Sequence, residues 1–189
     1  LTEVYTPVPP KIYFKNNIPT DAVVLFDGKD LNQWQGKDSK PAQWIVKDGS
    51  FTVKPGTGDI YTKEKFADQQ LHLEFRIPAD VKGEGQDRGN SGVFIMGEYE
   101  IQILDCYENK TYSNGQTAAL YKQSIPLANA CKKSGEWQNY DIIFQAPKFK
   151  SDGTLDTPAF VTVLHNGILV QNHYEIKGKT MYIGAPIYT

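Results

Sequence analysis

The sequence has few of the residues that mark metal, redox or nucleophilic chemistry. It contains two cysteines, Cys106 and Cys131, and three histidines, His72, His165 and His173. None of them has the spacing of a zinc site, and no Gly-x-Ser-x-Gly turn is present. The sequence therefore predicts no zinc centre and no serine nucleophile. For the two cysteines, one disulfide and two free buried thiols both remain open.

An excess of one charge and a long apolar run are also missing. The 189 residues include 20 basic and 22 acidic side chains, which gives a net charge of −2. Without a basic stripe, nucleic acid is not expected as a partner. No apolar run approaches the roughly 18 residues of a membrane span, so none is expected.

No stretch keeps a helical period over three turns, and turn residues recur at short spacing instead. The strongest hairpin signal is Asn166-Gly167, and Asp48-Gly49 is similar. Between the turns, apolar residues alternate with polar ones. We expect strands at residues 22–26, 70–77, 91–96, 99–104, 137–145, 160–164 and 168–171. This pattern predicts an all-β fold, a two-sheet antiparallel β-sandwich.

The proline distribution suggests the domain organisation. Residues 1–20 hold four of the 11 prolines and show no periodicity, so we expect an extended N-terminal arm there and a sandwich domain over 21–189. The opening without Met is compatible with a removed signal segment. It predicts a secreted or periplasmic protein, although an engineered start would look the same.

Two predicted strands carry polar side chains on one face. In residues 70–77 the face opposite Leu71 and Leu73 presents His72, Glu74 and Arg76. In residues 99–105 Glu100 and Gln102 alternate with Ile101 and Ile103. We expect the strands near 70–77, 91–96 and 99–105 to build one concave face, with Glu74, Arg76, Glu100 and Gln102 lining one pocket.

The order of several motifs resembles the 3-keto-disaccharide hydrolase family. The resemblance covers about residues 22–172 and implies a concanavalin A-like jelly-roll sandwich, a carbohydrate substrate and export from a bacterial cell. The family's closing Gln-Asp-His-Gly segment does not occur, so we expect either a different closure of the sheet or a missing last strand. The motifs are Leu25-Phe26-Asp27-Gly28-Lys29-Asp30-Leu31 with Trp34, Leu73-Glu74-Phe75-Arg76, Asn90-Ser91-Gly92-Val93-Phe94, Tyr99–Asp105, Ala119-Leu120-Tyr121, Gly135-Glu136-Trp137, Tyr140-Asp141-Ile142 and His165-Asn166-Gly167.

The spacing Glu100-x-Gln102-x-x-Asp105 is similar to the carboxylate strand of laminarinase-type glucanases. Gln102 stands where those enzymes place an acid, which argues against an ordinary retaining mechanism. A 3-keto sugar requires a base for the proton on C2 and a cation for the enolate oxygen. We expect Glu100 to be the base and Arg76 the cation, with Glu74 as a further catalytic group.

Six further residues are candidates for substrate binding, and each has a structural alternative. Asn90 fits a turn as well as a sugar contact, and His72 fits an exposed surface. Aromatic rings stack on the C–H faces of sugars, but sandwich cores also favour aromatics. Glu74 and Arg76 would also fit a cross-strand ion pair. The six candidates are Gln102, Asn90, Asp105, Tyr121, Trp137 and His72.

Three functions remain in competition. The first is an exported enzyme that cleaves 3-keto-disaccharides or related glycosides by hydrolysis or elimination, and Glu100 favours it. The second is a noncatalytic carbohydrate-binding module on the same fold, and the third is a structural domain of a surface complex. No cofactor is expected, with calcium held by Asp and backbone carbonyls as the open alternative.

Overall fold

The computed structural model describes residues 2–188 as two compact units, one up to Glu64 and one from Lys65 onwards. Among these residues all regular structure is antiparallel strand, apart from three single 3₁₀ turns at Lys37–Ser39, Gly85–Asp87 and Ser113–Gly115. The prediction of an all-β chain is therefore confirmed. No helix in residues 2–188 has the length and apolar character needed to cross a bilayer.

The first unit is built from short two-stranded ladders around a small aromatic cluster. The ring of Phe51 lies 4.8 Å from Phe26 and 5.7 Å from both Trp34 and Trp44. No residue from 2 to 64 is fully buried. The ladders pair β1 (Phe14–Lys15) with β2 (Ile18–Pro19), β3 (Trp34–Gln35) with β6 (Tyr61–Thr62), and β4 (Ile45–Lys47) with β5 (Ser50–Thr52).

The strand expected over residues 22–26 is wrong, whereas the Asp48-Gly49 hairpin is confirmed. Residues 22–26 join no ladder, and Val23 and Val24 are exposed rather than packed. Their apolar run therefore lacks the cross-strand partners that stabilise a strand. Asp48 and Gly49 have φ values of 50° and 73°, the left-handed values that a tight β-hairpin requires. The division into an arm over 1–20 and a domain over 21–189 stays a prediction, and the β1–β2 hairpin lies within that arm.

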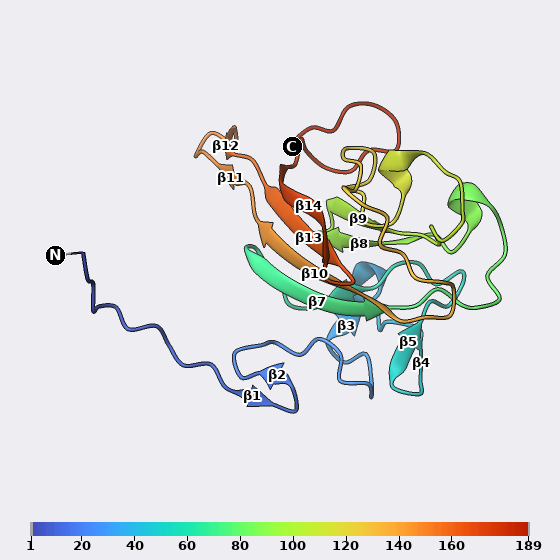
Figure 1. Ribbon diagram of the computed structural model, residues 1–189, viewed down its shortest axis with the longest axis horizontal. Coiled ribbons are helices and arrows are strands. Elements are labelled where there is room, and N and C mark those ends of the chain that lie inside the picture. Colours follow the sequence, from blue (N-terminus) through green and yellow to red (C-terminus); the bar gives the residue numbers. More distant parts are fainter. Residues whose placement is uncertain (1, 189) are drawn as a thin grey trace. The chain divides into compact units, whose positions relative to one another are not determined.

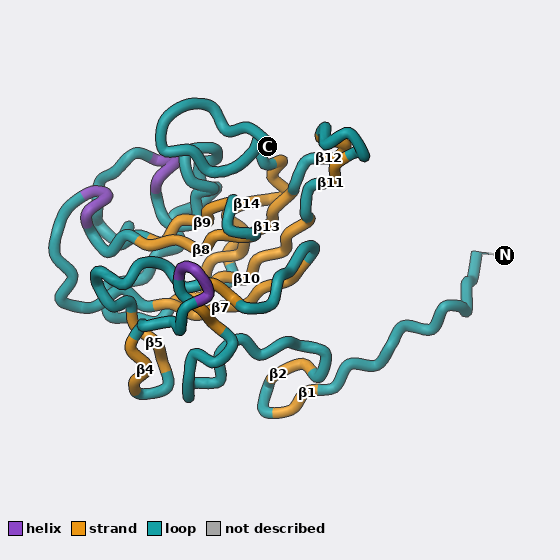
Figure 2. The backbone as a smooth tube through the Cα atoms, turned by 180° about the vertical axis from the view of Figure 1, so that it is seen from behind, coloured by secondary structure: helices purple, strands orange, loops and turns teal. Residues whose placement is uncertain are grey.

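The second unit contains a four-stranded antiparallel sheet in the order β14-β13-β10-β7 (Figure 1). Its curved strands run side by side when seen from behind as well (Figure 2). The β13–β14 turn is Asn166-Gly167, with φ values of 52° and 78°, which confirms the strongest hairpin signal of the sequence. The strands are β7 (Gln69–Phe75), β10 (Gln138–Gln145), β13 (Phe160–His165) and β14 (Ile168–Glu175); a small β11 (Lys148–Phe149) and β12 (Leu155–Thr157) ladder links β10 to β13.

A separate hairpin, β8 (Ser91–Ile95) with β9 (Tyr99–Ile103), packs on one face of this sheet. Ile101 and Tyr99 from the hairpin share one core with Tyr140 and Phe144 from the sheet, and all four are almost fully buried. Tyr140 Oη also donates a 2.6 Å hydrogen bond to the carbonyl of Gln102. The core of the second unit therefore lies between the sheet and the hairpin.

This layering overturns one expectation about the site. β7 belongs to the four-stranded sheet, while β8 and β9 pair with each other. The three strands therefore do not form one concave face. The physical reason is that β7 finds its hydrogen-bonding partner in β10, far along the chain, a pairing that the local alternation of side chains does not reveal.

Candidate active site

Glu100 lies on the face of β9 that points away from the core. Ile101 is fully buried in the core, so the alternation of the strand turns Glu100 and Gln102 to the other side. In the β8–β9 register, Phe94 stands opposite Glu100 and Gly92 opposite Gln102. These four residues therefore share one outer face, as the sequence predicts for Glu100 and Gln102.

The Glu100 side chain crosses β8 over Gly92. A Cβ atom at position 92 would overlap Oε1, Cγ and Cδ of Glu100. Gly92 thus leaves the space that the Glu100 side chain occupies. Position 92 therefore favours glycine because of this space, and not because of the backbone conformation. The strand fixes the Glu100 backbone, and the missing side chain of Gly92 makes room for the carboxylate.

Residues 118–121 extend this face on the other side of β9. The amide of Gln102 donates to Ala119 O at 3.0 Å, and the amide of Tyr121 donates to Glu100 O at 2.9 Å. Leu120 points into the core beside Ile101, so Tyr121 lies on the side of Glu100. The structure thus brings together Glu100 and Tyr121, two of the predicted site residues.

Tyr121 belongs to a cluster of three tyrosines and one lysine. The hydroxyls of Tyr112 and Tyr121 are 2.5 Å apart, and the Tyr182 ring lies 6.0 Å from the Tyr121 ring. Lys122 Nζ lies 5.7 Å from the ring centres of Tyr112 and Tyr121 and 4.9 Å from that of Tyr182. Burial, with the hydrogen bonds of Tyr112 and Tyr182, raises the pKa of Tyr121. Its phenol therefore remains protonated and can donate a hydrogen bond at neutral pH.

The C-terminal segment is tied to β9 at Glu100. The amide of Glu100 donates to Thr180 Oγ1 at 2.9 Å, and the amide of Thr180 donates to Glu98 O at 2.8 Å. Lys122 Nζ donates to Tyr182 O at 2.8 Å. These bonds hold Tyr182, which is far away in sequence, at the tyrosine cluster.

Gln102 and Asn90 belong to an amide network next to Glu100. The fully buried Gln102 donates from Nε2 to Gln86 Oε1 at 3.2 Å and to Gly115 O at 3.4 Å. Asn90 donates from Nδ2 to Gln86 O at 3.0 Å. Gln102 Oε1 is buried and has no hydrogen-bond partner among residues 2–188. The network supports the strand beneath Glu100, and a fully buried Gln102 side chain has no surface to offer a sugar.

Asp105 is held in a structural ion pair. Its Oδ2 accepts from Arg88 Nε at 2.9 Å and from Ser134 Oγ at 2.5 Å, and its side chain is only 2% exposed. Its Oδ1 accepts from the amide of Tyr107. The carboxylate therefore joins three loops behind β9, and it does not lie beside Glu100 as the sequence suggested.

The other predicted residues lie on the opposite side of the unit. Leu73 and Phe75 of β7 pack on the core, so the alternation turns His72 and Glu74 to the outer face of the four-stranded sheet, where both are exposed. His72 Nδ1 lies 2.6 Å from Asp141 Oδ1 on β10.

Arg76 accompanies them, with its guanidinium 4.9 Å above the ring of Trp137. The core thus separates Arg76, Glu74, His72 and Trp137 from Glu100, and the expectation of one continuous pocket is wrong. Arg76 packs on the ring of Trp137, so an ion pair with Glu74 is not needed to hold the Arg76 side chain.

His165 and the cysteines are structural as the side chains are placed. His165 is buried at the end of β13, and its Nε2 lies 2.9 Å from Gln138 Oε1. Burial, reinforced by the charge of Lys132, lowers its pKa to about 4. Cys106 and Cys131 are both free thiols. The Cys106 sulfur accepts from the amide of Thr117 at 3.0 Å, and hydrogen bonding to Cys131 and Thr117 lowers its pKa to about 7.

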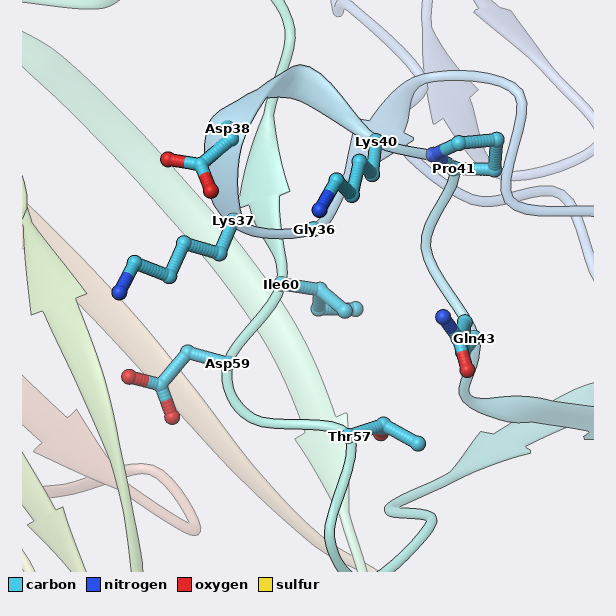
Figure 3. A pocket seen from close by; sticks show the side chains of 9 residues that line it. All are labelled: Gly36, Lys37, Asp38, Lys40, Pro41, Gln43, Thr57, Asp59 and Ile60. Atoms are coloured by element: carbon cyan, nitrogen blue, oxygen red, sulfur yellow. The ribbon is translucent and has the colours of Figure 1, made fainter.

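The described residues contain no metal cluster, and a hollow lies in the first unit. No group of three or more His, Cys, Asp or Glu side chains in residues 2–188 is arranged to hold a metal ion. A hollow of about 200 Å³ lies in the first unit between residues 36–43 and 57–60 (Figure 3). It contains none of the predicted site residues. Its lining is Gly36, Lys37, Asp38, Lys40, Pro41, Gln43, Thr57, Asp59 and Ile60.

Sequence reasoning missed Gly92, Tyr112, Lys122 and Tyr182. The position of Gly92 beside Glu100 follows from the register between β8 and β9, which the sequence does not reveal. Tyr112, Lys122 and Tyr182 lie in loops, where no periodicity indicates which way a side chain points. Lys122 follows Tyr121 directly, and this adjacency is the one signal that the sequence offered.

Comparison with known proteins shows the family of this chain. The model of the 3-keto-alpha-glucoside-1,2-lyase-like domain family matches residues 21–185. A crystal structure of a "putative glycosyl hydrolase" from Parabacteroides distasonis ATCC 8503 is 53% identical in sequence, with a TM-score of 0.94. That match covers 98% of this chain and 81% of the other. The predicted family resemblance is thereby confirmed.

Two more distant matches support fewer conclusions about this chain. A second Parabacteroides distasonis crystal structure with the same description is 21% identical, with a TM-score of 0.53, and covers 78% of this chain and 70% of the other. At this identity it supports the fold alone. SPARC-like protein 1 of Coturnix japonica is 20% identical over 91 residues, or 47% of this chain, and the chain spans 14% of that protein's length.

Proposed function

Since this chain belongs to the 3-keto-alpha-glucoside-1,2-lyase-like domain family, we propose that it cleaves the glycosidic bond of 3-keto-disaccharides or related glycosides with Glu100 as the base. The observation that carries this proposal is the Glu100 side chain over Gly92, next to the segment of the buried Tyr121, whose amide donates to Glu100 O. A carboxylate on this face can act as the base in a proton abstraction beside a ketone, which also requires a hydrogen-bond donor for the enolate oxygen.

The reaction begins at the hydrogen on C2, which the ketone at C3 makes acidic. Glu100 takes this proton, and the electron pair of the C2–H bond forms the enolate of C2 and C3. The enolate then expels the glycosidic oxygen from C1, which leaves a C1–C2 double bond, and the leaving oxygen takes up a proton. Addition of water to C1 afterwards would complete a net hydrolysis.

A residue other than Arg76 must supply the positive charge for the enolate oxygen. Arg76 lies across the core from Glu100, so we propose the ammonium group of Lys122 as the donor to the enolate oxygen or the leaving group. Lys122 lies over the Tyr121 ring, and Tyr121 is bonded through its amide to Glu100 O. Donors placed where charge develops stabilise a transition state more than they stabilise the bound substrate.

The architecture and the location complete the proposal. We propose that the second unit is a two-sheet jelly-roll sandwich of the concanavalin A-like type, which the core shared by the sheet and the β8–β9 hairpin supports. Export from the cytoplasm is proposed from the family resemblance, and fractionation of the source cells would test it.

Turnover of paired substrates tests the function. The protein is incubated with a 3-keto-glucoside and with the same glucoside unoxidised, and the products are identified by mass spectrometry. We expect cleavage of the 3-keto compound alone. Glu100→Gln keeps the shape of the side chain but not its basicity, so it should lower kcat by about 10²–10⁴-fold while binding changes far less.

Arg76→Met is the matched control, because it removes a charged group from the opposite side of the core. It should leave kcat and KM unchanged. Parent-like turnover by Glu100→Gln would refute Glu100 as the base. Binding of glycans without consumption of any 3-keto-glycoside would instead support the carbohydrate-binding module, which the tyrosine cluster also suits.

A further inference from the structure

We propose that Tyr182 binds the second sugar unit of the substrate and so makes the site selective for disaccharides over glycosides with small leaving groups. This inference rests on the proposed function of Glu100. Three observations carry it: the loop that presents Tyr182 is anchored beside Glu100, the ring is exposed next to the Lys122 ammonium, and the ring lies 6.0 Å from that of Tyr121.

Tyr182 lies at the tip of a loop whose two ends are joined. The amide of Lys179 donates to Ile187 O at 3.1 Å, and Tyr188 Oη donates to Ile176 O at 2.7 Å. A side chain on Gly178 would overlap the backbone of Ile187. Compact loops closed in this way are often functional, and this one projects Tyr182 from a fixed base.

The loop is also fixed to the catalytic face. Thr180 bonds to the residues on both sides of Tyr99, through Glu98 O just before β9 and the amide of Glu100 within it. Two residues later, the carbonyl of Tyr182 accepts from Lys122 Nζ. The loop that carries Tyr182 is thereby held beside Glu100, although 82 positions separate Tyr182 from Glu100 in the sequence.

The Tyr182 ring is exposed in a way that leaves it available to a ligand. It is 73% exposed, although Lys122 Nζ lies 4.9 Å from its centre. The intramolecular ammonium takes the place that a cationic ligand would need. A sugar suits the remaining surface, because its C–H face packs on an aromatic ring while its hydroxyls stay in contact with water.

The arrangement identifies which sugar unit Tyr182 would meet. The Glu100 side chain leans over Gly92 of β8, while the Tyr182 loop is bonded to the opposite edge of β9. A 3-keto unit at the carboxylate would therefore leave the Tyr182 ring to the adjoining unit.

Two substrates that differ only in the leaving group test the inference. Parent protein and Tyr182→Ala are assayed with a 3-keto-disaccharide and with methyl 3-keto-glucoside. We expect Tyr182→Ala to lower kcat/KM for the disaccharide by about tenfold, the size of a lost aromatic contact, with little change for the methyl glycoside. Tyr182→Phe should keep the selectivity, because it keeps the ring.

Ile183→Ala is the control, since Ile183 lies on the same loop and is 87% exposed; it should behave as the parent. An equal loss with both substrates, or no loss with either, would overturn the inference while leaving the role of Glu100 intact. If the parent consumes neither substrate, the proposed function fails, and the inference fails with it.

Discussion

Gly92 is the residue on which the position of the Glu100 carboxylate depends most directly. In Gly92→Ala the new Cβ would meet the Glu100 side chain, which is flexible at its far end, so the carboxylate should move while the strand stays intact. Displacement of a catalytic group by about 1 Å can cost about 10²-fold in rate. We therefore expect a loss of turnover near that size, with the free energy of unfolding changed by less than about 1 kcal/mol.

The control for this prediction is Gly36→Ala. The nearest atoms to a Cβ at Gly36 are 3.6 Å away, and its φ is ordinary, so this variant should keep both activity and stability. Steady-state kinetics and thermal unfolding measured on the two variants give the answer. Full activity in Gly92→Ala would mean that Glu100 does not need its present position.

His165 should make the stability of the protein depend on pH. Burial lowers its pKa from 6.5 to about 4, so between these values the unfolded chain binds a proton that the folded protein does not. The contribution of neutral His165 to stability is therefore complete above pH 6.5 and is lost as the pH falls towards 4. The difference between the two pKa values corresponds to about 3 kcal/mol of unfolding free energy.

Urea unfolding between pH 4 and pH 7 measures this effect. His165→Gln removes the titrating group, and it should flatten the slope of unfolding free energy against pH over that interval. The variant will be less stable at pH 7, because the imidazole also packs on Phe75 and Tyr140. An unchanged slope would show that other groups dominate the acid response.

At the scale of elements, Asp105 decides how the loop after β9 is held. Its carboxylate joins Arg88, Ser134 and the amide of Tyr107. Asp105→Asn removes the charge opposite Arg88, whose side chain is 27% exposed. A fully buried pair would lose about 3–5 kcal/mol; with Arg88 partly in water we expect about 2–3 kcal/mol.

KM for the 3-keto substrate should stay at the parent value in Asp105→Asn, because Asp105 does not share the face of Glu100. Asp80→Asn on an exposed loop serves as the control and should leave stability within about 0.5 kcal/mol of the parent. Unchanged stability together with a raised KM would return Asp105 to the substrate-binding residues that the sequence suggested.

The elements also show what could be predicted from the sequence. Alternation placed Leu71, Leu73 and Phe75 on the core side of β7 and Ile101 and Ile103 on the core side of β9, because side-chain direction within a strand is a local property. It could not show that β7 pairs with β10 instead of β8. That pairing joins residues more than 60 positions apart. Because the sequence did not predict it, Arg76 was expected on the wrong side of the core.

Loops limited the prediction of the site in the same way. Tyr121 was predicted through its motif, but Tyr112 and Tyr182 reach the cluster through the hydroxyl pair with Tyr121 and the carbonyl bond from Lys122. These contacts depend on the tertiary structure, and no spacing in the sequence encodes them.

At the scale of the whole molecule, burial is distributed very unevenly. Every fully buried residue among 2–188 lies at or beyond Phe75, and none lies in residues 2–64. Since burial of apolar surface is the main stabilising contribution to folding, the second unit contains what is needed for independent stability. The first unit has three two-stranded ladders and an aromatic cluster, and isolated two-stranded ladders are marginal in water.

We therefore expect a fragment of residues 65–189 to unfold in one cooperative transition and a fragment of residues 1–64 to show none. Differential scanning calorimetry on the two fragments and on the full chain measures this directly. Because Glu100, Tyr121 and Tyr182 all lie in the second unit, the longer fragment should also retain turnover of a 3-keto-glycoside. A cooperative transition in 1–64, or a 65–189 fragment without one, would show that stability is shared between the units in a way that burial within each does not reveal.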